Sequence, residues 1–328
     1  MEKMLAAALA LLIGLLMTRV FKMFRLHLPD VTAFLIAGLI IGPHCLGRIG
    51  IEGVGFTSAA EVENLSVISN TALGFIAFSI GNEFLLSQLK AIGKQAVIVG
   101  IFQALAATLF VDVALIGLHF LMPDKLSIEA TIVLGAIAAA TAPAATLMVV
   151  RQYKAKGKLT DILLPVVALD DAVGLAVFAV SFGIADSLVT GNTDLVGILV
   201  EPLIQIAASL VLGSILGWVL TMLERTFFSN SNRLSLTIAF VVLTVALSMI
   251  SFEIGGVRIS FSTLLVCMML GTVFCNICPL SHDLMERADK WTVPLFALFF
   301  VLSGAELELD VLKDGAVILV GVVYILMR

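Results

Sequence analysis

Long apolar segments follow one another along almost the whole chain, and they constrain its fold more than any other feature. A helix needs about 20 predominantly apolar residues to cross a bilayer. Eleven segments of roughly this length are separated by short polar breaks: 4–20, 31–49, 66–87, 95–121, 129–150, 161–186, 195–223, 235–252, 259–277, 290–305 and 315–328. Strand-type alternation is not evident among them. The pattern predicts an all-α, polytopic membrane protein with no soluble domain.

The composition excludes the ordinary soluble classes. Hydrophobic residues make up 60% of the 328 residues, charged residues only 13%, and the mean hydropathy is +1.14. Soluble domains average about 45–50% apolar and about 25% charged residues. The four cysteines lie in or beside apolar segments, so no disulfide framework is expected. Segment 4–20 lacks a small-residue cleavage site and is predicted to be a transmembrane helix rather than a signal peptide.

Basic residues alternate regularly between successive loops. If the N-terminus lies outside, the loops on the cytoplasmic side carry thirteen Lys and Arg residues and the loops on the other side carry five. Short cytoplasmic loops are enriched in these residues. The count therefore predicts an outside N-terminus in a multi-pass protein, which we expect in the plasma membrane.

Two stretches far apart in the chain resemble each other. When Gly81 is aligned with Gly304, Glu83 falls on Glu306. The first stretch ends the third predicted helix on the inside and the second ends the tenth on the outside, as an inverted repeat requires. Glu83 and Glu306 are candidate gates of the two mouths, although ordinary helix ends with snorkelling charges explain them equally well. The predicted layout is one transmembrane domain over 1–328, with a first repeat at about 4–186, a linker helix at about 195–223 and a partial second repeat at about 235–328.

Two adjacent carboxylates lie inside a predicted membrane helix. Asp171 follows the helix start near Asp161 by ten residues, which places it roughly 15 Å into a hydrocarbon core about 30 Å thick. Carboxylates at such depth are costly and usually mark ion pathways or proton relays. The Asp170–Asp171 pair can hold a proton or a hard monovalent cation, and competition between the two is the physical basis of an exchanger. The alternative is a structural pair satisfied by neighbouring helices.

The preceding predicted helix contains a proline. Pro143 removes a backbone donor and is expected to interrupt the helical hydrogen bonds. The freed carbonyls and the hydroxyls of Thr141 and Thr146 would then be oxygen ligands for an ion. Irregular backbone at membrane depth is tolerated where it is buried in protein or lines a cavity. A simple proline kink is the alternative.

Three motifs together resemble the monovalent cation/proton antiporter family. Residues 28–31 with 39–47 resemble its second-helix signature, residues 81–84 (Gly-Asn-Glu-Phe) resemble its Gly-Leu-Glu-Phe stretch, and residues 168–171 (Ala-Leu-Asp-Asp) resemble the Asp-Asp core of its electrogenic sodium/proton members. The resemblance covers the whole chain. It implies the sodium/proton antiporter fold with inverted repeats and broken core helices, a homodimer, and an elevator-type core domain that moves against a dimerisation domain.

The resemblance also implies residue roles. It makes Asp171 the ion-binding carboxylate and Asp170 the partner of a basic residue on a later core helix, for which Arg328 is the only candidate here. An Arg in place of the more usual Lys leaves that pairing open, because the two side chains differ in geometry and in ease of deprotonation. The potassium-efflux (Kef) branch usually carries Gln-Asp, so Asp170 argues against that branch.

The predicted function is exchange of monovalent cations, with Na⁺ favoured, for protons across a lipid bilayer. Alternatives are a Kef-type K⁺/H⁺ antiporter and, more distantly, a non-transporting or channel-like membrane protein or an intramembrane aspartyl protease. The protease needs two membrane aspartates on different helices. No enzyme activity, cofactor or nucleic-acid partner is expected, and Cys275-x-x-Cys278 lacks the second pair of ligands that a metal site needs.

The length of the second repeat predicts that the chain is a fragment. A second repeat equal to the first would extend past Arg328, so residues 1–328 are expected to hold about eleven of the thirteen helices that the resemblance implies. Residues 1–328 alone are therefore not expected to catalyse exchange, because the second broken helix would be missing.

Overall fold

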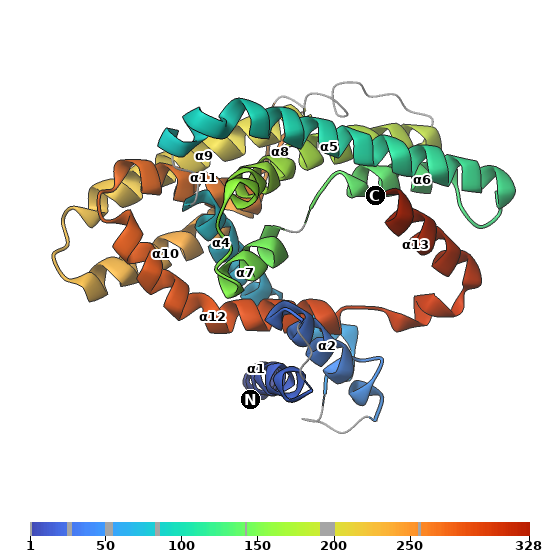
Figure 1. Cartoon of the computed structure of the whole chain (residues 1–328), viewed down its shortest axis with the longest axis horizontal. Helices are drawn as coiled ribbons and strands as arrows, with labels where there is room; N and C mark the ends of the chain where they lie inside the picture. Colours follow the sequence, from blue (N-terminus) through green and yellow to red (C-terminus); the bar gives the residue numbers. More distant parts are fainter. Residues whose placement is uncertain are drawn as a thin grey trace.

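The computed structural model describes residues 2–24, 28–49, 55–82, 86–141, 143–190, 201–254 and 257–328, and most of these residues are helical (Figure 1). The helices are α1 (Glu2–Met23), α2 (Asp30–Ile41), α3 (Ala59–Glu63), α4 (Ser66–Asn82), α5 (Leu86–Leu121), α6 (Ile128–Ala138), α7 (Pro143–Gln152), α8 (Lys158–Thr190), α9 (Glu201–Glu224), α10 (Asn230–Ser248), α11 (Thr263–Ile277), α12 (Ser281–Ala305) and α13 (Gly315–Met327). Two short 3-10 helices, η1 (Leu46–Ile49) and η3 (Leu309–Lys313), follow α2 and α12. The predicted helical class is confirmed.

Over the described residues, six helical stretches are long and apolar enough to cross a membrane, judged by length and composition. They correspond to the predicted segments 4–20, 31–49, 95–121, 195–223, 235–252 and 290–305. Four other predicted segments overlap shorter apolar helical stretches: Ile128–Ala138, Ala176–Ala185, Thr263–Ile277 and Gly315–Met327. The total of eleven spans stays a prediction.

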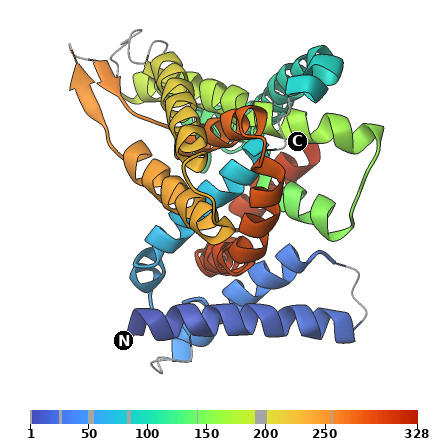
Figure 2. The same ribbon diagram turned by 90° about the vertical axis from the view of Figure 1, so that its left-hand side faces the viewer.

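A short hairpin separates α10 from α11, where the sequence was expected to be helical or to turn. Strand β1 (Phe252–Ile254) pairs antiparallel with β2 (Val257–Ile259), and Phe252 lies opposite Ile259. Helix α10 therefore ends four residues earlier than predicted, and α11 begins four residues later. The two strands alternate apolar and charged residues on either side of two glycines, a pattern that favours a hairpin. Figure 2 shows the hairpin at the upper left, beside α9.

The helices pack in two groups, which Figures 1 and 2 show from two directions. In the first helical group (α1, α2, α4 and α9–α12), α4 packs on α11 and α12, α2 packs on α1 and α12, and α9 packs on α11. In the second helical group (α5, α6, α8 and α13), the helices α5, α6 and α8 pack on one another and α13 packs on α5. Helix α7 contacts α2 and α4 of the first group and α8 of the second.

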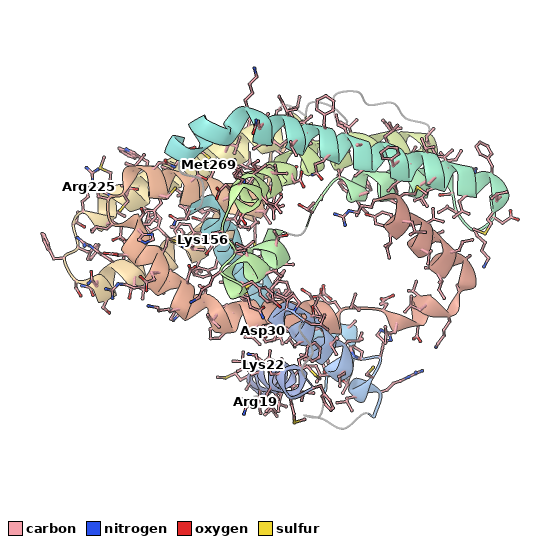
Figure 3. The ribbon with its side chains drawn as sticks, viewed as in Figure 1. Arg19, Lys22, Asp30, Lys156, Arg225 and Met269 are labelled. Atoms are coloured by element: carbon pink, nitrogen blue, oxygen red, sulfur yellow. The ribbon has the colours of Figure 1, made fainter. Side chains whose placement is uncertain are left out.

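Each group has its own apolar core. In the first group, Phe78 and Phe274 are buried with their ring centroids 5.9 Å apart. In the second group, Val111 and Leu115 of α5 pack with residues of α6 and α13. Near the surface, the Lys22 ammonium at the end of α1 is 3.9 Å from the Asp30 carboxylate at the start of α2 (Figure 3).

Glycines bring the backbones of α4 and α11 into direct contact. A Cβ on Gly81 of α4 would collide with the carbonyl oxygen of Met268. A Cβ on Gly271 of α11 would collide with the carbonyl oxygen of Phe78. Small residues at such crossings allow membrane helices to pack closely. On each helix, the residue whose carbonyl is contacted lies three positions before the glycine: Phe78 before Gly81, and Met268 before Gly271.

The pair formed by α12 and α2 repeats this arrangement position by position. A Cβ on Gly304 of α12 would collide with the carbonyl oxygen of Leu35, and a Cβ on Gly38 of α2 would collide with that of Val301. Here too the contacted carbonyls lie three residues before the glycines. Gly304 is the residue that the sequence comparison aligned with Gly81, so the two crossings match the predicted inverted repeat. The boundaries of the repeats themselves stay a prediction.

Candidate ion-binding site

The segment predicted to span 129–150 is two helices rather than one. Helix α6 ends at Ala138 and α7 begins at Pro143, which leaves Thr141 between them. Proline is favoured as the first residue of a helix, because the N–H that it lacks would have no partner within the helix. The break therefore lies in the residues just before the proline.

Asp170 lies opposite this break, near the middle of α8. It follows Lys158 by twelve residues, which corresponds to roughly 18 Å along a helix of 33 residues. Its side chain is fully buried, at 0% exposure. A buried carboxylate is costly unless hydrogen bonds or an opposite charge compensate it, so its partners define the site.

Both carboxylate oxygens of Asp170 accept hydrogen bonds. The Thr141 hydroxyl, from the break, donates to Oδ2 over 2.8 Å. The side-chain amide of Gln103, on α5, donates to Oδ1. Three elements that are separate in the sequence thus converge on one carboxylate. All three contribute oxygen or amide groups, which are suited to binding a hard cation or to exchanging a proton.

Arg328 provides the positive charge of this site. It follows α13, and its guanidinium donates a hydrogen bond to the carbonyl oxygen of Ala140 in the break. It also interacts electrostatically with Asp170. Arg328 therefore lies at the break with its charge near Asp170, whereas the hydrogen bonds to that carboxylate come from Gln103 and Thr141.

The other residues proposed from the sequence lie as follows. Asp171 is the next residue of α8, and its side chain lies outside the described part of the structure. Thr146 is half-buried in α7, one turn after Pro143. Glu83 lies outside the described residues, and Glu306 is exposed directly after α12 in the first helical group. The structure thus brings together Thr141, Asp170 and Arg328, but not Glu306.

Gln103 was not among the site residues predicted from the sequence. Its only signal is an amide side chain within the predominantly apolar stretch Lys94–Leu121. Polar side chains in membrane helices usually bond across helices, so each of them is a candidate for a buried network. Among the described residues, no group of three or more His, Cys, Asp and Glu side chains is arranged to hold a metal ion.

Comparison with protein families gives one match over nearly the whole chain. Residues 7–328 match the family described as sodium/hydrogen exchanger, transmembrane. No curated protein matches the chain at a significant level.

Proposed function

The chain belongs to the transmembrane sodium/hydrogen exchanger family, and on this premise we propose that it exchanges Na⁺ for protons by elevator-type alternating access. The family is one of transporters and not of enzymes, and it carries monovalent cations and protons. The protein is therefore a multi-pass membrane antiporter. Its cation preference, its mechanism, an outside N-terminus, a homodimeric state and a plasma-membrane location belong to the proposal.

The observation that carries this proposal is the burial of Asp170 at a helix break. A fully buried carboxylate is supported there by Thr141 and Gln103, with Arg328 nearby. Asp171 follows it directly in α8. In a carboxylate pair at membrane depth, a cation and a proton compete for the same negative charge. Binding of one releases the other, which couples the two fluxes.

The division of the helices into two groups supports the elevator mechanism. The site is built from α5, α8, the α6–α7 break and the end of α13, which all belong to or adjoin the second helical group. In the first group, the backbones of α4 and α11, and those of α2 and α12, are in direct contact at glycines. This group is therefore suited to remain fixed. Movement of the second group against the first would carry the site from one side of the membrane to the other.

Transport by the purified full-length protein tests this function. In proteoliposomes that hold an imposed pH gradient, addition of Na⁺ is expected to dissipate the gradient, and addition of K⁺ is expected to act more weakly. Protein-free liposomes serve as the control for leakage. A response to K⁺ without a response to Na⁺ would favour the Kef-type alternative, and no response to Na⁺, Li⁺ or K⁺ would refute exchange.

Labelling of single cysteines tests the proposed orientation. Lys156, in the α7–α8 turn, and Asp124, in the α5–α6 turn, are both exposed and should face opposite sides of the membrane. With the exposed Cys45 replaced by Ser, we expect Lys156→Cys to react only from the cytoplasm and Asp124→Cys only from outside. The parent protein without either new cysteine is the control, because its three remaining cysteines are buried. The reverse pattern would overturn the orientation.

A further inference from the structure

A further carboxylate lies inside the second helical group, apart from the Asp170–Asp171 pair. Asp112 is in α5, within the apolar stretch Lys94–Leu121. It follows Gln103 by nine residues, which corresponds to about 14 Å along the helix. The midpoint of the stretch is near Thr108, so Asp112 lies at a depth where hydrocarbon surrounds the protein. Ionisable residues at such depth usually have a functional role.

The Asp112 carboxyl group packs against α6, and its Oδ1 has no hydrogen-bond partner among the described residues. This Oδ1 atom is buried. A Cβ on Gly135 of α6 would collide with this carboxyl group. Glycine at that position therefore provides the space that the carboxyl group occupies. A buried polar group left unsatisfied in this way is rare in native structures and requires an explanation.

Other hydroxyl groups lie along the same interface. Thr108 is one turn before Asp112 in α5, and its Oγ1 is also buried without a partner. Helices α5 and α6 run antiparallel across a short turn, so Thr108 lies toward the end of α6 at which the break begins. In the other direction, the fully buried Thr131 lies one turn before Gly135 in α6. This row of oxygen atoms leads from the α5–α6 turn toward the break that contains Thr141.

Among the described residues, no opposite charge forms an ion pair with Asp112. The titratable residues on α5 and on the helices that pack against it are Lys90, Lys94, His119, Glu129, Lys158, Asp161, Asp170, Asp171, Asp186 and Tyr324, with Arg328 after α13. In the part of the chain that the structure describes, none of them forms a hydrogen bond or an ion pair with Asp112. An uncompensated carboxylate anion at membrane depth is strongly disfavoured. The two oxygens without a partner, Asp112 Oδ1 and Thr108 Oγ1, are too few to replace the hydration shell of a cation. The ligand that fits is therefore a proton.

We propose that Asp112 is a further proton-binding carboxyl of the protein, separate from the Asp170–Asp171 pair, which takes up and releases a proton between the α5–α6 turn and the helix break. This role rests on the proposed exchange function. In the proposed role of Asp112, the proton moves along the α5–α6 interface, where the neighbouring hydroxyl groups are those of Thr131 and Thr108. The cation does not use this route, since its ligands are at the break.

Infrared spectroscopy tests the proposal without depending on transport. Difference spectra of the lipid-reconstituted protein between alkaline and acidic pH record the C=O stretch of each carboxyl group that takes up a proton. We expect one such band to disappear in Asp112→Asn and to remain in Asp124→Asn, the matched change at an exposed site in the α5–α6 turn. The band should also remain in Asp170→Asn. An unchanged spectrum in Asp112→Asn would overturn the proposal.

Chemical labelling of the wild type provides a second measurement if Asp112→Asn does not fold. A hydrophobic carbodiimide reacts with a protonated carboxyl: the acid proton moves to a carbodiimide nitrogen, the carboxyl oxygen bonds to the central carbon, and transfer of the acyl group to nitrogen gives an N-acylurea. Mass spectrometry should find this adduct on Asp112 at acidic pH and a loss of it at alkaline pH. Absent or pH-independent labelling would contradict the role. If Asp112 titrates but the liposomes show no exchange, only the exchange function fails.

Discussion

Exchange is expected to disappear when Asp171 is replaced by Asn. Asp171 follows Asp170 directly in α8. Asp170 already has both oxygens engaged by Thr141 and Gln103. In the proposed mechanism, the carboxylate that binds cation and proton in turn is that of Asp171. Asparagine is neutral at every working pH, so the Na⁺-driven proton flux in proteoliposomes should fall to the level of protein-free liposomes.

The matched control for this substitution is Asp161→Asn. Asp161 lies in the first turn of the same helix, and its side chain is exposed. Its replacement should leave the rate of exchange unchanged, which separates a general effect of charge on α8 from an effect at the site. Retention of full exchange by Asp171→Asn would show that another group binds the transported ion.

The same substitution at Asp170 is expected to have a different result. Asn at this position can still accept the hydroxyl of Thr141, and rotation of the Gln103 amide lets its oxygen accept from the new N–H₂ group. The site should therefore fold and retain exchange, but with one titrating charge fewer. If each wild-type cycle moves one net charge, a potential of 100 mV contributes about 2.3 kcal/mol. Currents on a solid-supported membrane should depend strongly on voltage in the wild type and only weakly in Asp170→Asn. Voltage-insensitive transport by the wild type would contradict the roles assigned to Asp170 and Asp171.

The sequence predicted the helices and the break because both are local properties. Each apolar run indicates a membrane helix by its length, and a proline at position 143 can only begin or interrupt one. Thr141 and Asp170 were both predicted as candidate ligands on consecutive segments, and the structure adds the hydrogen bond between them. The hairpin at 252–259 also had a local signal, in its alternation around two glycines, which the apolar flanking segments obscured.

The sequence analysis did not predict Gln103 or Asp112, because their roles depend on contacts between helices. Gln103 bonds to a residue 67 positions later in the chain. In a soluble protein, the apolar stripe of a helix indicates which face is buried. In a membrane helix such as α5, both the lipid-facing and the protein-facing sides are apolar, so the pattern does not show where a single polar side chain points. Gly135, which provides the space for the Asp112 carboxyl group, gives no signal in the sequence either, because its role depends on the packing of α6 on α5.

A single methyl group at Gly304 is expected to destabilise the protein strongly. The Cβ of Gly304→Ala would overlap the backbone carbonyl of Leu35, and a carbonyl within a helix cannot rotate away as a side chain would. Helices α2 and α12 must therefore move apart, which disturbs the core of the first helical group. Overpacking of this kind typically costs about 1–3 kcal/mol. The apparent melting temperature of the purified protein in detergent, measured at one fixed heating rate, should fall clearly.

Gly81→Ala should lower the melting temperature by a similar amount, because Gly81 occupies the equivalent position in the crossing of α4 with α11. Gly117→Ala is the matched control: Gly117 is also within a membrane helix, but a Cβ there would meet nothing within 4 Å. Since glycine is less favourable than alanine in a helix by about 0.5–1 kcal/mol, this variant should be as stable as the wild type or slightly more stable. If Gly304→Ala and Gly81→Ala both melt like Gly117→Ala, the close backbone contacts do not hold the first group together. If only one of the two is destabilised, the crossings are not equivalent, and the inverted repeat loses its structural support.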